Sequence, residues 1–326
     1  MDDFSKRVAV CKKDIESIKK EVSKVVIGQQ EIVDSIIRAI ISDGHVLLEG
    51  VPGLAKTLVV RTIASVFGCD FKRIQFTPDL LPADLIGITT YDKEKGFYVV
   101  KGPIFTNFVL ADEINRAPPK VQSALLECMQ ERQATIGRES FQIPSPFFVL
   151  ATQNPLESLG TYPLPEAQID RFLFKLKVGY PNLEEENLIL ENNITIKKFE
   201  AYNLRPIYSA ENLMKLQETV KQIYCDEKIK KYVVSIVDAT RHPNDYGIKL
   251  GKYIEWGASP RASIGLYIAS KAEALMQGKT FVVPQFVKNV AFDVLRHRII
   301  VNYEGQSENI TSEDIIREVL NRVPIP

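Results

Sequence analysis

One short stretch of the chain has the residue types that bind a phosphate group. Its glycines would let successive backbone N–H groups curve around an anion, and the helix N-terminus that follows would add partial positive charge. A lysine at the end of such a loop reaches the β- and γ-phosphates of a nucleotide, and a following hydroxyl can ligate Mg²⁺. The residues expected to bind nucleotide are Gly50, Val51, Pro52, Gly53, Leu54, Ala55, Lys56, Thr57 and Leu58, with the Thr57 hydroxyl also on the metal.

The neighbours of this stretch support that interpretation. Residues 45–49 form a short apolar run of strand length, and apolar residues recur at helical spacing from Leu58 to Phe67. Ala55 departs from the general pattern, because a glycine is expected before the lysine. A methyl group fits there only if the residue already has helical dihedral angles. The alternative is an ordinary turn that happens to end in Lys-Thr, and the strand–loop–helix context favours phosphate binding.

Two further apolar runs end in polar side chains. The run at 105–110 leads into Asp112 and Glu113, and the run at 146–152 leads to Asn154. Nucleotide hydrolysis needs a bound Mg²⁺, an aligned water and positive charge on the γ-phosphate. Asp112 suits the metal, with water between them, and Glu113 suits polarising the attacking water. Asn154 could orient that water or sense the γ-phosphate.

Each of these residues also has a plainer interpretation. The acidic pair could cap a helix, although a buried strand that ends in two acids needs a reason for them. The asparagine precedes Pro155 and could simply form a turn. Combined with the phosphate loop, the hydrolytic interpretation is favoured. An apolar turn at Ile27 and Gly28, between two predicted helices, could be the wall of an adenine pocket or a plain connection, and the residues leave this open.

The elements that must position these residues are those of an α/β fold. Strand-length apolar runs alternate with helical patterns as far as residue 180, which predicts a parallel sheet flanked by helices, with ligands at the carboxyl ends of the strands. Alternating segments at 79–103 and 134–143 predict two inserted hairpins. Helical patterns dominate afterwards. We therefore expect a nucleotide-binding domain at 1–195, including N-terminal helices, and a smaller all-α lid at 196–326.

Bulk composition excludes several classes of protein. The 326 residues contain 41 Lys and Arg against 41 Asp and Glu, so no overall charge draws the chain to nucleic acid or an anionic membrane. The four cysteines are widely separated, as in a reduced cytoplasmic protein, and the three histidines do not cluster. No secretory signal or membrane-span-length apolar run is present. We expect a cytoplasmic protein that is not an integral membrane protein.

Five ordered motifs, taken together, resemble the MoxR family of AAA+ ATPases. They are G-x-P-G-x-A-K-T at 50–57, D-E-I-N-R-A-P-P-K at 112–120, A-T-Q-N-P at 151–155, I-D-R-F at 169–172 and G-A-S-P-R-A at 257–262. The resemblance runs from about residue 20 to the C-terminus, and it accounts for Ala55, since this branch carries alanine before the lysine. It implies a P-loop AAA+ module, Walker B acids at Asp112 and Glu113, and a sensor-1 residue at Asn154.

The resemblance also assigns two arginines. It implies that Arg171 is an arginine finger reaching a neighbouring subunit's nucleotide, and that Arg261 is a sensor-2 arginine on the lid. From the residues alone, Arg171 beside Asp170 could equally be a surface ion pair, which contributes little. Arg261 follows Ser-Pro at a predicted helix start, where it could face a ligand. The role of Arg116 stays open.

The two predicted hairpins are similar to the helix-2 insert and pre-sensor-1 hairpin of this branch, which face the pore of ring assemblies. Tyr91, Phe97 and Tyr98 could grip a protein client there or could simply pack between strands.

The resemblance implies an ATPase that binds ATP or ADP with Mg²⁺, assembles as a ring, expected to be hexameric, and remodels protein complexes like a chaperone. Members of the family typically act with von Willebrand factor A domain proteins. Two alternatives are a nucleic-acid-dependent motor or loader and a non-hydrolysing nucleotide switch. The neutral charge counts against the first, and the complete set Lys56, Thr57, Asp112, Glu113 and Asn154 counts against the second.

Overall fold

The computed structural model describes residues 3–50, 56–94, 96–154, 160–180, 182–193 and 199–326. Its centre is a five-stranded parallel sheet with the strand order β2-β5-β8-β1-β9. The predicted parallel sheet is thus confirmed, and its central strands are almost entirely buried, as their continuous apolar runs require. The strands are β1 (Val46–Gly50), β2 (Phe71–Gln75), β5 (Phe108–Asp112), β8 (Phe148–Gln153) and β9 (Phe174–Val178).

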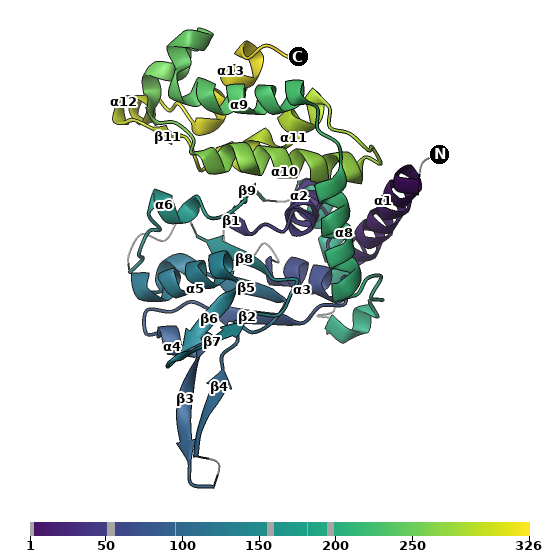
Figure 1. Ribbon diagram of the computed structural model, residues 1–326, viewed down its shortest axis with the longest axis vertical. Coiled ribbons are helices and arrows are strands. Elements are labelled where there is room, and N and C mark those ends of the chain that lie inside the picture. Colours follow the sequence, from purple (N-terminus) through teal and green to yellow (C-terminus); the bar gives the residue numbers. More distant parts are fainter. Residues whose placement is uncertain (1–2, 51–55, 95, 155–159, 181, 194–198) are drawn as a thin grey trace.

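Helices cover both faces of the sheet (Figure 1). Successive strand residues point to opposite faces, so Leu110 and Leu150 enter one core while Val109 and Val149 enter the other. The first core includes side chains of α1 (Asp3–Val22), α2 (Gln30–Ile41) and α3 (Lys56–Val66). The second includes side chains of α4 (Pro82–Ile86) and α5 (Pro119–Glu131).

Both predicted hairpins are present. One consists of β3 (Gly87–Asp92) and β4 (Gly96–Lys101), and the other of β6 (Gln133–Ile136) and β7 (Glu139–Gln142). The β3–β4 hairpin projects far from the sheet (Figure 1). Near its tip the rings of Tyr91 and Phe97 lie 5.2 Å apart and are 62% and 79% exposed. These two aromatic rings therefore contact each other and are not buried between strands.

The C-terminal part of the chain forms the helical lid. Several of its helices begin at capping side chains, and the predicted capping box of Thr311 and Asp314 is present. A short antiparallel strand pair, β10 (Ile254–Trp256) with β11 (Ile300–Val301), is an addition that helical periodicity does not predict. The lid helices are α8 (Ala210–Gln222), α9 (Glu227–Arg241), α10 (Pro260–Met276), α11 (Pro284–Leu295), α12 (Tyr303–Ser307) and α13 (Ser312–Arg322).

Two short helices and four 3₁₀ segments complete the described elements. The helices, α6 and α7, flank β9 in the sequence. These elements are α6 (Glu166–Ile169), α7 (Leu183–Asn193) and the 3₁₀ segments Ile114–Arg116, Phe199–Tyr202, Pro243–Tyr246 and Lys249–Tyr253.

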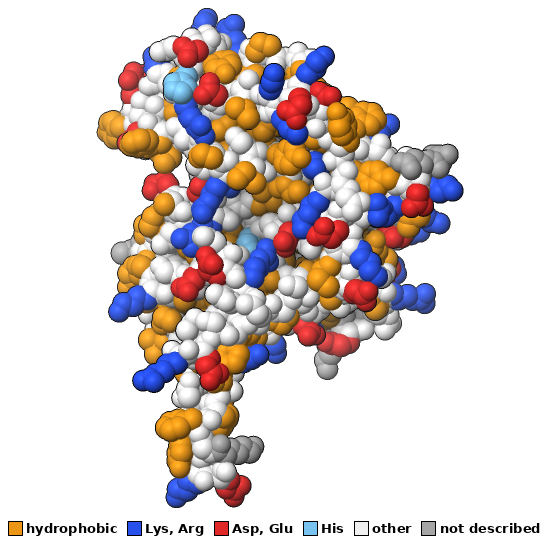
Figure 2. Space-filling model, viewed as in Figure 1, with side chains coloured by type: hydrophobic (Ala, Val, Ile, Leu, Met, Phe, Trp, Pro, Cys, Tyr) orange, Lys and Arg blue, Asp and Glu red, His pale blue; other side chains and the backbone are white. Residues whose placement is uncertain are grey.

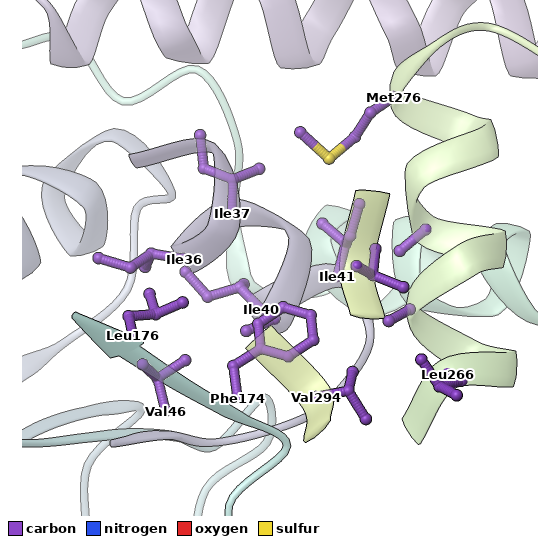
Figure 3. Close-up of a cluster of buried hydrophobic side chains, with 14 of the residues drawn as sticks. Ile36, Ile37, Ile40, Ile41, Val46, Phe174, Leu176, Leu266, Met276 and Val294 are labelled. Carbon is purple, nitrogen blue, oxygen red and sulfur yellow. The ribbon is translucent and has the colours of Figure 1, made fainter. Parts of the chain in front are cut away.

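The lid and the sheet share one apolar core. Figure 3 shows the α2 side chains between the strands and the lid, with Phe174 of β9 beside Val294 of α11. Leu266 and Met276 of α10 belong to the same buried cluster. The lid therefore packs onto the sheet in two ways, through α2 and directly where α11 meets β9. On the face shown in Figure 2, basic and acidic side chains are interspersed. Among the described residues, no helix is both long and apolar enough to span a bilayer.

Two buried histidines make stability depend on pH. His45 Nε2 donates to the Met129 carbonyl oxygen (3.2 Å), and its Nδ1 accepts from the Val149 N–H (3.1 Å), so the ring is neutral. Burial lowers the pKa of His45 to about 3. Burial also lowers the pKa of His297 well below its ordinary value.

We expect the free energy of unfolding to fall as the pH drops below about 6.5, the pKa of histidine in the unfolded chain, toward about 3. In this window the unfolded state binds protons that the folded His45 does not bind. At about pH 5 the loss should be about 2 kcal/mol for this histidine. Urea denaturation at about pH 7.5 and pH 5 measures it. The loss of stability should be smaller in His45→Gln than in the wild type. His242→Gln is the control, because the His242 ring is exposed, and its loss should equal that of the wild type. Equal losses in the wild type and both variants would contradict the assignment to His45.

Candidate functional site

The carboxyl end of β1 positions the lysine of the phosphate loop. Lys56 is the first residue of α3, and its Nζ donates to the Gly50 carbonyl oxygen at 2.5 Å. Burial lowers the pKa of Lys56, whereas the nearby charges of Asp112 and Glu113 act to raise it. The ammonium group therefore lies within electrostatic range of both acids. Thr57 and Leu58 follow in the first turn of α3 and are half-buried; Val51, Pro52, Gly53, Leu54 and Ala55 lie outside the described residues.

Asp112 is the last residue of β5, where strand pairing places Gln75 opposite it. Its Oδ1 accepts a hydrogen bond from the Thr152 hydroxyl on β8 (2.7 Å). Its Oδ2 accepts from Nη2 of Arg73 on β2 (2.6 Å). The carboxylate is thus held from both neighbouring strands. Oδ2 also accepts from Arg73 Nε (3.0 Å), so both of its lone pairs are used, whereas Oδ1 retains one.

Glu113 follows in a left-handed backbone conformation, with φ +57°, which is uncommon for a residue with a side chain. Its N–H donates to the Thr152 hydroxyl oxygen (2.8 Å), so one threonine fixes both acids. Its Oε2 accepts hydrogen bonds from Gln75 Nε2 (2.8 Å) and Arg116 Nη1 (2.9 Å). In this state the carboxylate is held by a residue at the end of β2 and by the turn that follows β5.

Asn154 lies at this edge of the sheet, whereas the Ile27–Gly28 turn contacts α7. Asn154 comes one residue after β8 and is 6% exposed. It therefore lies at the same edge of the sheet as Asp112, between β5 and β1 in strand order. Gly28 has φ +68°, and a Cβ there would lie 2.7 Å from the Glu185 carboxyl carbon of α7. The turn favours glycine because the backbone is left-handed there, while the end of the flexible Glu185 side chain lies against it.

The oxygen donors at this edge fit Mg²⁺. This ion prefers hard oxygen ligands and usually keeps several waters, with one or two protein ligands and the substrate phosphates completing the shell. Asp112 Oδ1 has one lone pair available, and Thr57 is next to the lysine whose charge interacts with Asp112. The residues present therefore suit a metal held between these two side chains and a nucleotide.

The two predicted arginines lie elsewhere. A cavity of about 280 Å³ is lined by Gly44 and His45, which precede β1, together with Arg171 and Arg261. Leu173, just before β9, donates its N–H to the His45 carbonyl oxygen, so this is the amino-terminal edge of the sheet. The five residues of β1 span about 16 Å between the two edges. The structure therefore separates both arginines from the Lys56 site of the same chain.

The arginines themselves are exposed and loosely held. Arg171 Nη1 donates to the Leu126 carbonyl oxygen at 3.3 Å, and the Arg261 side chain is 45% exposed, with Nη1 3.9 Å from Asp170 Oδ2. Neither contact uses the full hydrogen-bonding capacity of a guanidinium group. Both side chains therefore retain donors for a further partner.

Comparison with known proteins shows the family. Residues 45–174 match the model described as ATPase family associated with various cellular activities, and residues 251–319 match the AAA lid domain. The chain is 48% identical over 309 residues to Chaperone MoxR1 of Mycobacterium tuberculosis, with 94% of this chain and 81% of that protein covered. The chain belongs to the MoxR family of AAA ATPases.

Two other proteins extend this relationship. YeaC of Bacillus subtilis is 44% identical, over 94% of this chain and 93% of its own length. The crystal structure of a candidate ATPase from Cytophaga hutchinsonii superimposes with a TM-score of 0.93 at 46% identity, and covers 98% of this chain and 97% of that one. The MoxR fold therefore includes the N-terminal helices as well as the two matched domains.

The AAA match of this MoxR chain includes most of its candidate site residues. Its span from His45 to Phe174 contains Lys56, both acids and Arg171, while Arg261 lies in the lid match. Sequence reasoning did not single out Arg73, Gln75 or Thr152. Arg73 and Gln75 are two residues apart in β2, so their side chains point to the same face near the carboxyl end of the strand. This spacing of two polar residues is the sequence pattern that could have predicted their role. Thr152 gave no signal, because it is buried within an apolar run.

Proposed function

We propose that this MoxR-family chain hydrolyses ATP to ADP and phosphate with Mg²⁺. The observation that carries the proposal is that β1 and β5, parallel strands of one sheet, deliver Lys56, Asp112 and Glu113 to the same edge, where the charges of both acids act on the lysine. There Gly50, Lys56 and the loop between them would hold the phosphates, with Thr57 and Asp112 on the metal. Ile27, Gly28 and Leu58 would border the nucleotide.

Each acid would then have one task. Mg²⁺, when bound, would neutralise charge on the phosphate oxygens. Glu113 would polarise the attacking water once it leaves Gln75 and Arg116, and Asn154 would orient that water or sense the γ-phosphate. Lys56 would stabilise the developing negative charge in a site partly shielded from solvent.

We further propose that the complete site is shared between subunits of a ring, expected to be hexameric. Arg171 and Arg261 lie at the sheet edge opposite Lys56, where they would meet the nucleotide of an adjacent copy. In this arrangement Arg171 would be the arginine finger. Arg261, as the sensor-2 arginine, would contact the same nucleotide of the adjacent subunit. The nucleotide domain at 1–195 and the lid at 196–326 would then both contribute to one shared site.

The work done by hydrolysis would be chaperone-like remodelling of protein complexes in the cytoplasm. The name Chaperone MoxR1 of the relative from Mycobacterium tuberculosis supports this direction. The exposed aromatic tip of the β3–β4 hairpin offers a surface for a protein client. A von Willebrand factor A domain protein is the partner proposed from the family resemblance.

Phosphate release from ATP tests the proposal. The wild-type chain with Mg²⁺ should release phosphate, and Lys56→Ala should reduce turnover by about 10²-fold or more, because one fixed cation is lost from the transition state. Chelation of Mg²⁺ should have a comparable effect. Lys72→Ala is the matched control, since Lys72 is an exposed lysine on β2. Hydrolysis that is unaffected by Lys56→Ala would overturn the proposed site.

A further inference from the structure

The segment that carries Arg171 is held by a buried arginine of the lid. Arg298 lies just after α11, and only 3% of its side chain is exposed. Its Nε donates to Asp170 Oδ1 at 2.7 Å, and its Nη2 donates to the carbonyl oxygens of Asp170 (3.1 Å) and Phe172 (2.7 Å). These acceptors belong to the residues immediately before and after Arg171.

The remaining donors of Arg298 are also used. Its Nη1 donates to the carbonyl oxygens of Leu173 (3.1 Å) and Val294. A guanidinium group has five N–H donors, and all five are satisfied here. A lysine has three donors on one atom and cannot reproduce this planar pattern. The arrangement is therefore specific for arginine.

The same carboxylate links a second lid segment. Asp170 Oδ2 accepts a hydrogen bond from the Ser259 hydroxyl (2.9 Å), and Ser259 is the N-cap of α10, two residues before Arg261. Asp170 thus joins the end of α11 and the start of α10 to the turn before β9. The positions of Arg171 and Arg261 are coupled through one side chain.

We propose that Arg298 is a positioning residue for Arg171, setting where this arginine meets the nucleotide of an adjacent subunit. The inference rests on the proposed shared site and adds the lid residue on which that site depends. A buried ion pair is often neutral for stability when compared with apolar residues of similar size. A displacement of about 1 Å in a catalytic group, in contrast, can cost about 10²-fold in rate.

Arg298→Lys tests the proposal. It retains the positive charge but releases the carbonyl oxygens on both sides of Arg171. The expected result is a decrease in kcat of about 10- to 10²-fold, with the dissociation constant of ATP changed by less than about twofold. Weakened ATP binding with unchanged kcat would overturn the proposal. Asp170→Asn, which removes the charge that Arg298 binds, is a second variant that should give the same pattern.

Mixed assemblies show on which subunit the defect acts. In an Arg298→Lys subunit the Lys56 site and Glu113 are intact, so turnover should recover when Glu113→Gln subunits supply a correctly placed Arg171. Mixing Arg298→Lys with Arg171→Ala subunits should give no recovery, because both fail to supply that group. Recovery in the second mixture, or none in the first, would overturn the proposal.

Two controls distinguish a failure of the proposed role of Arg298 from a failure of the proposed shared site. Arg296→Lys alters a half-buried lid arginine that contacts Asp293, Glu313 and the Lys175 carbonyl oxygen but not residues 170–173. It should leave turnover within about threefold of wild type, and a loss matching that of Arg298→Lys would count against the assignment. If Arg171→Ala and Glu113→Gln subunits recover activity when mixed but Arg298→Lys and Glu113→Gln do not, the shared site survives and only the role of Arg298 fails.

Discussion

Replacing Glu113 with glutamine is expected to reduce ATP turnover by about 10²- to 10⁴-fold while leaving ATP binding intact. Glutamine is nearly isosteric, and its carbonyl oxygen can still accept from Gln75 and Arg116. What it loses is the negative charge that polarises the attacking water. Lys56, Asp112 and Thr57 keep their positions, so phosphate and metal binding should persist.

Two measurements check this prediction. Phosphate release gives turnover, and the dissociation constant of ATP gives binding. Glu139→Gln is the matched control, because Glu139 is exposed on the β6–β7 hairpin. Near-normal turnover in Glu113→Gln would show that another group polarises the water. A parallel loss of ATP binding would indicate that Glu113 acts on the nucleotide or metal instead.

Arg171→Ala is expected to reduce turnover by roughly 10³- to 10⁵-fold, the effect of losing an arginine finger. In the structure this side chain makes one 3.3 Å bond to the Leu126 carbonyl oxygen, so its removal should cost little stability. The loss should therefore show in kcat, with the thermal midpoint shifted by only a few degrees.

Mixing distinguishes a finger that acts on the neighbour from one that acts on its own site. Arg171→Ala subunits retain Glu113, and Glu113→Gln subunits retain Arg171, so mixed assemblies should recover turnover that neither variant shows alone. Arg317→Ala removes an exposed lid arginine and should leave activity unchanged. If mixing brings no recovery, Arg171 does not act between subunits.

Much of the sheet could be predicted because buried parallel strands are continuous apolar runs. The acids and Asn154 were found because each follows such a run, and parallel strands place their carboxyl ends at one edge. Thr152 could not be predicted, because a single hydroxyl group inside an apolar run gives no indication of its partners. Only the pairing of β5 with β8 shows that it lies between Asp112 and Glu113.

The separation of the arginines from Lys56 could not be predicted in the same way. Periodicity shows which face of a helix is apolar but not which surface that face covers. Arg298 and Asp170 are 128 residues apart in the sequence, so no local pattern near either residue predicts their contact. The change to helical patterns after residue 180 predicted a separate lid. In the structure α10 and α11 of the lid share an apolar core with the sheet.

Under the proposed mechanism, the two hydrogen bonds on the Glu113 carboxylate would limit the basal rate of ATP hydrolysis. A hydrogen bond to a charged group contributes about 1.5–3 kcal/mol, so the Gln75 bond alone would be broken in roughly one molecule in ten to one in a hundred. The Arg116 bond would lower the freed fraction further. In that mechanism, bound ATP would wait until Glu113 is released before it is hydrolysed. A conformational change that moves β2 relative to β5 would break the bond from Gln75 to Glu113 and so raise the rate of hydrolysis, with every catalytic residue unchanged.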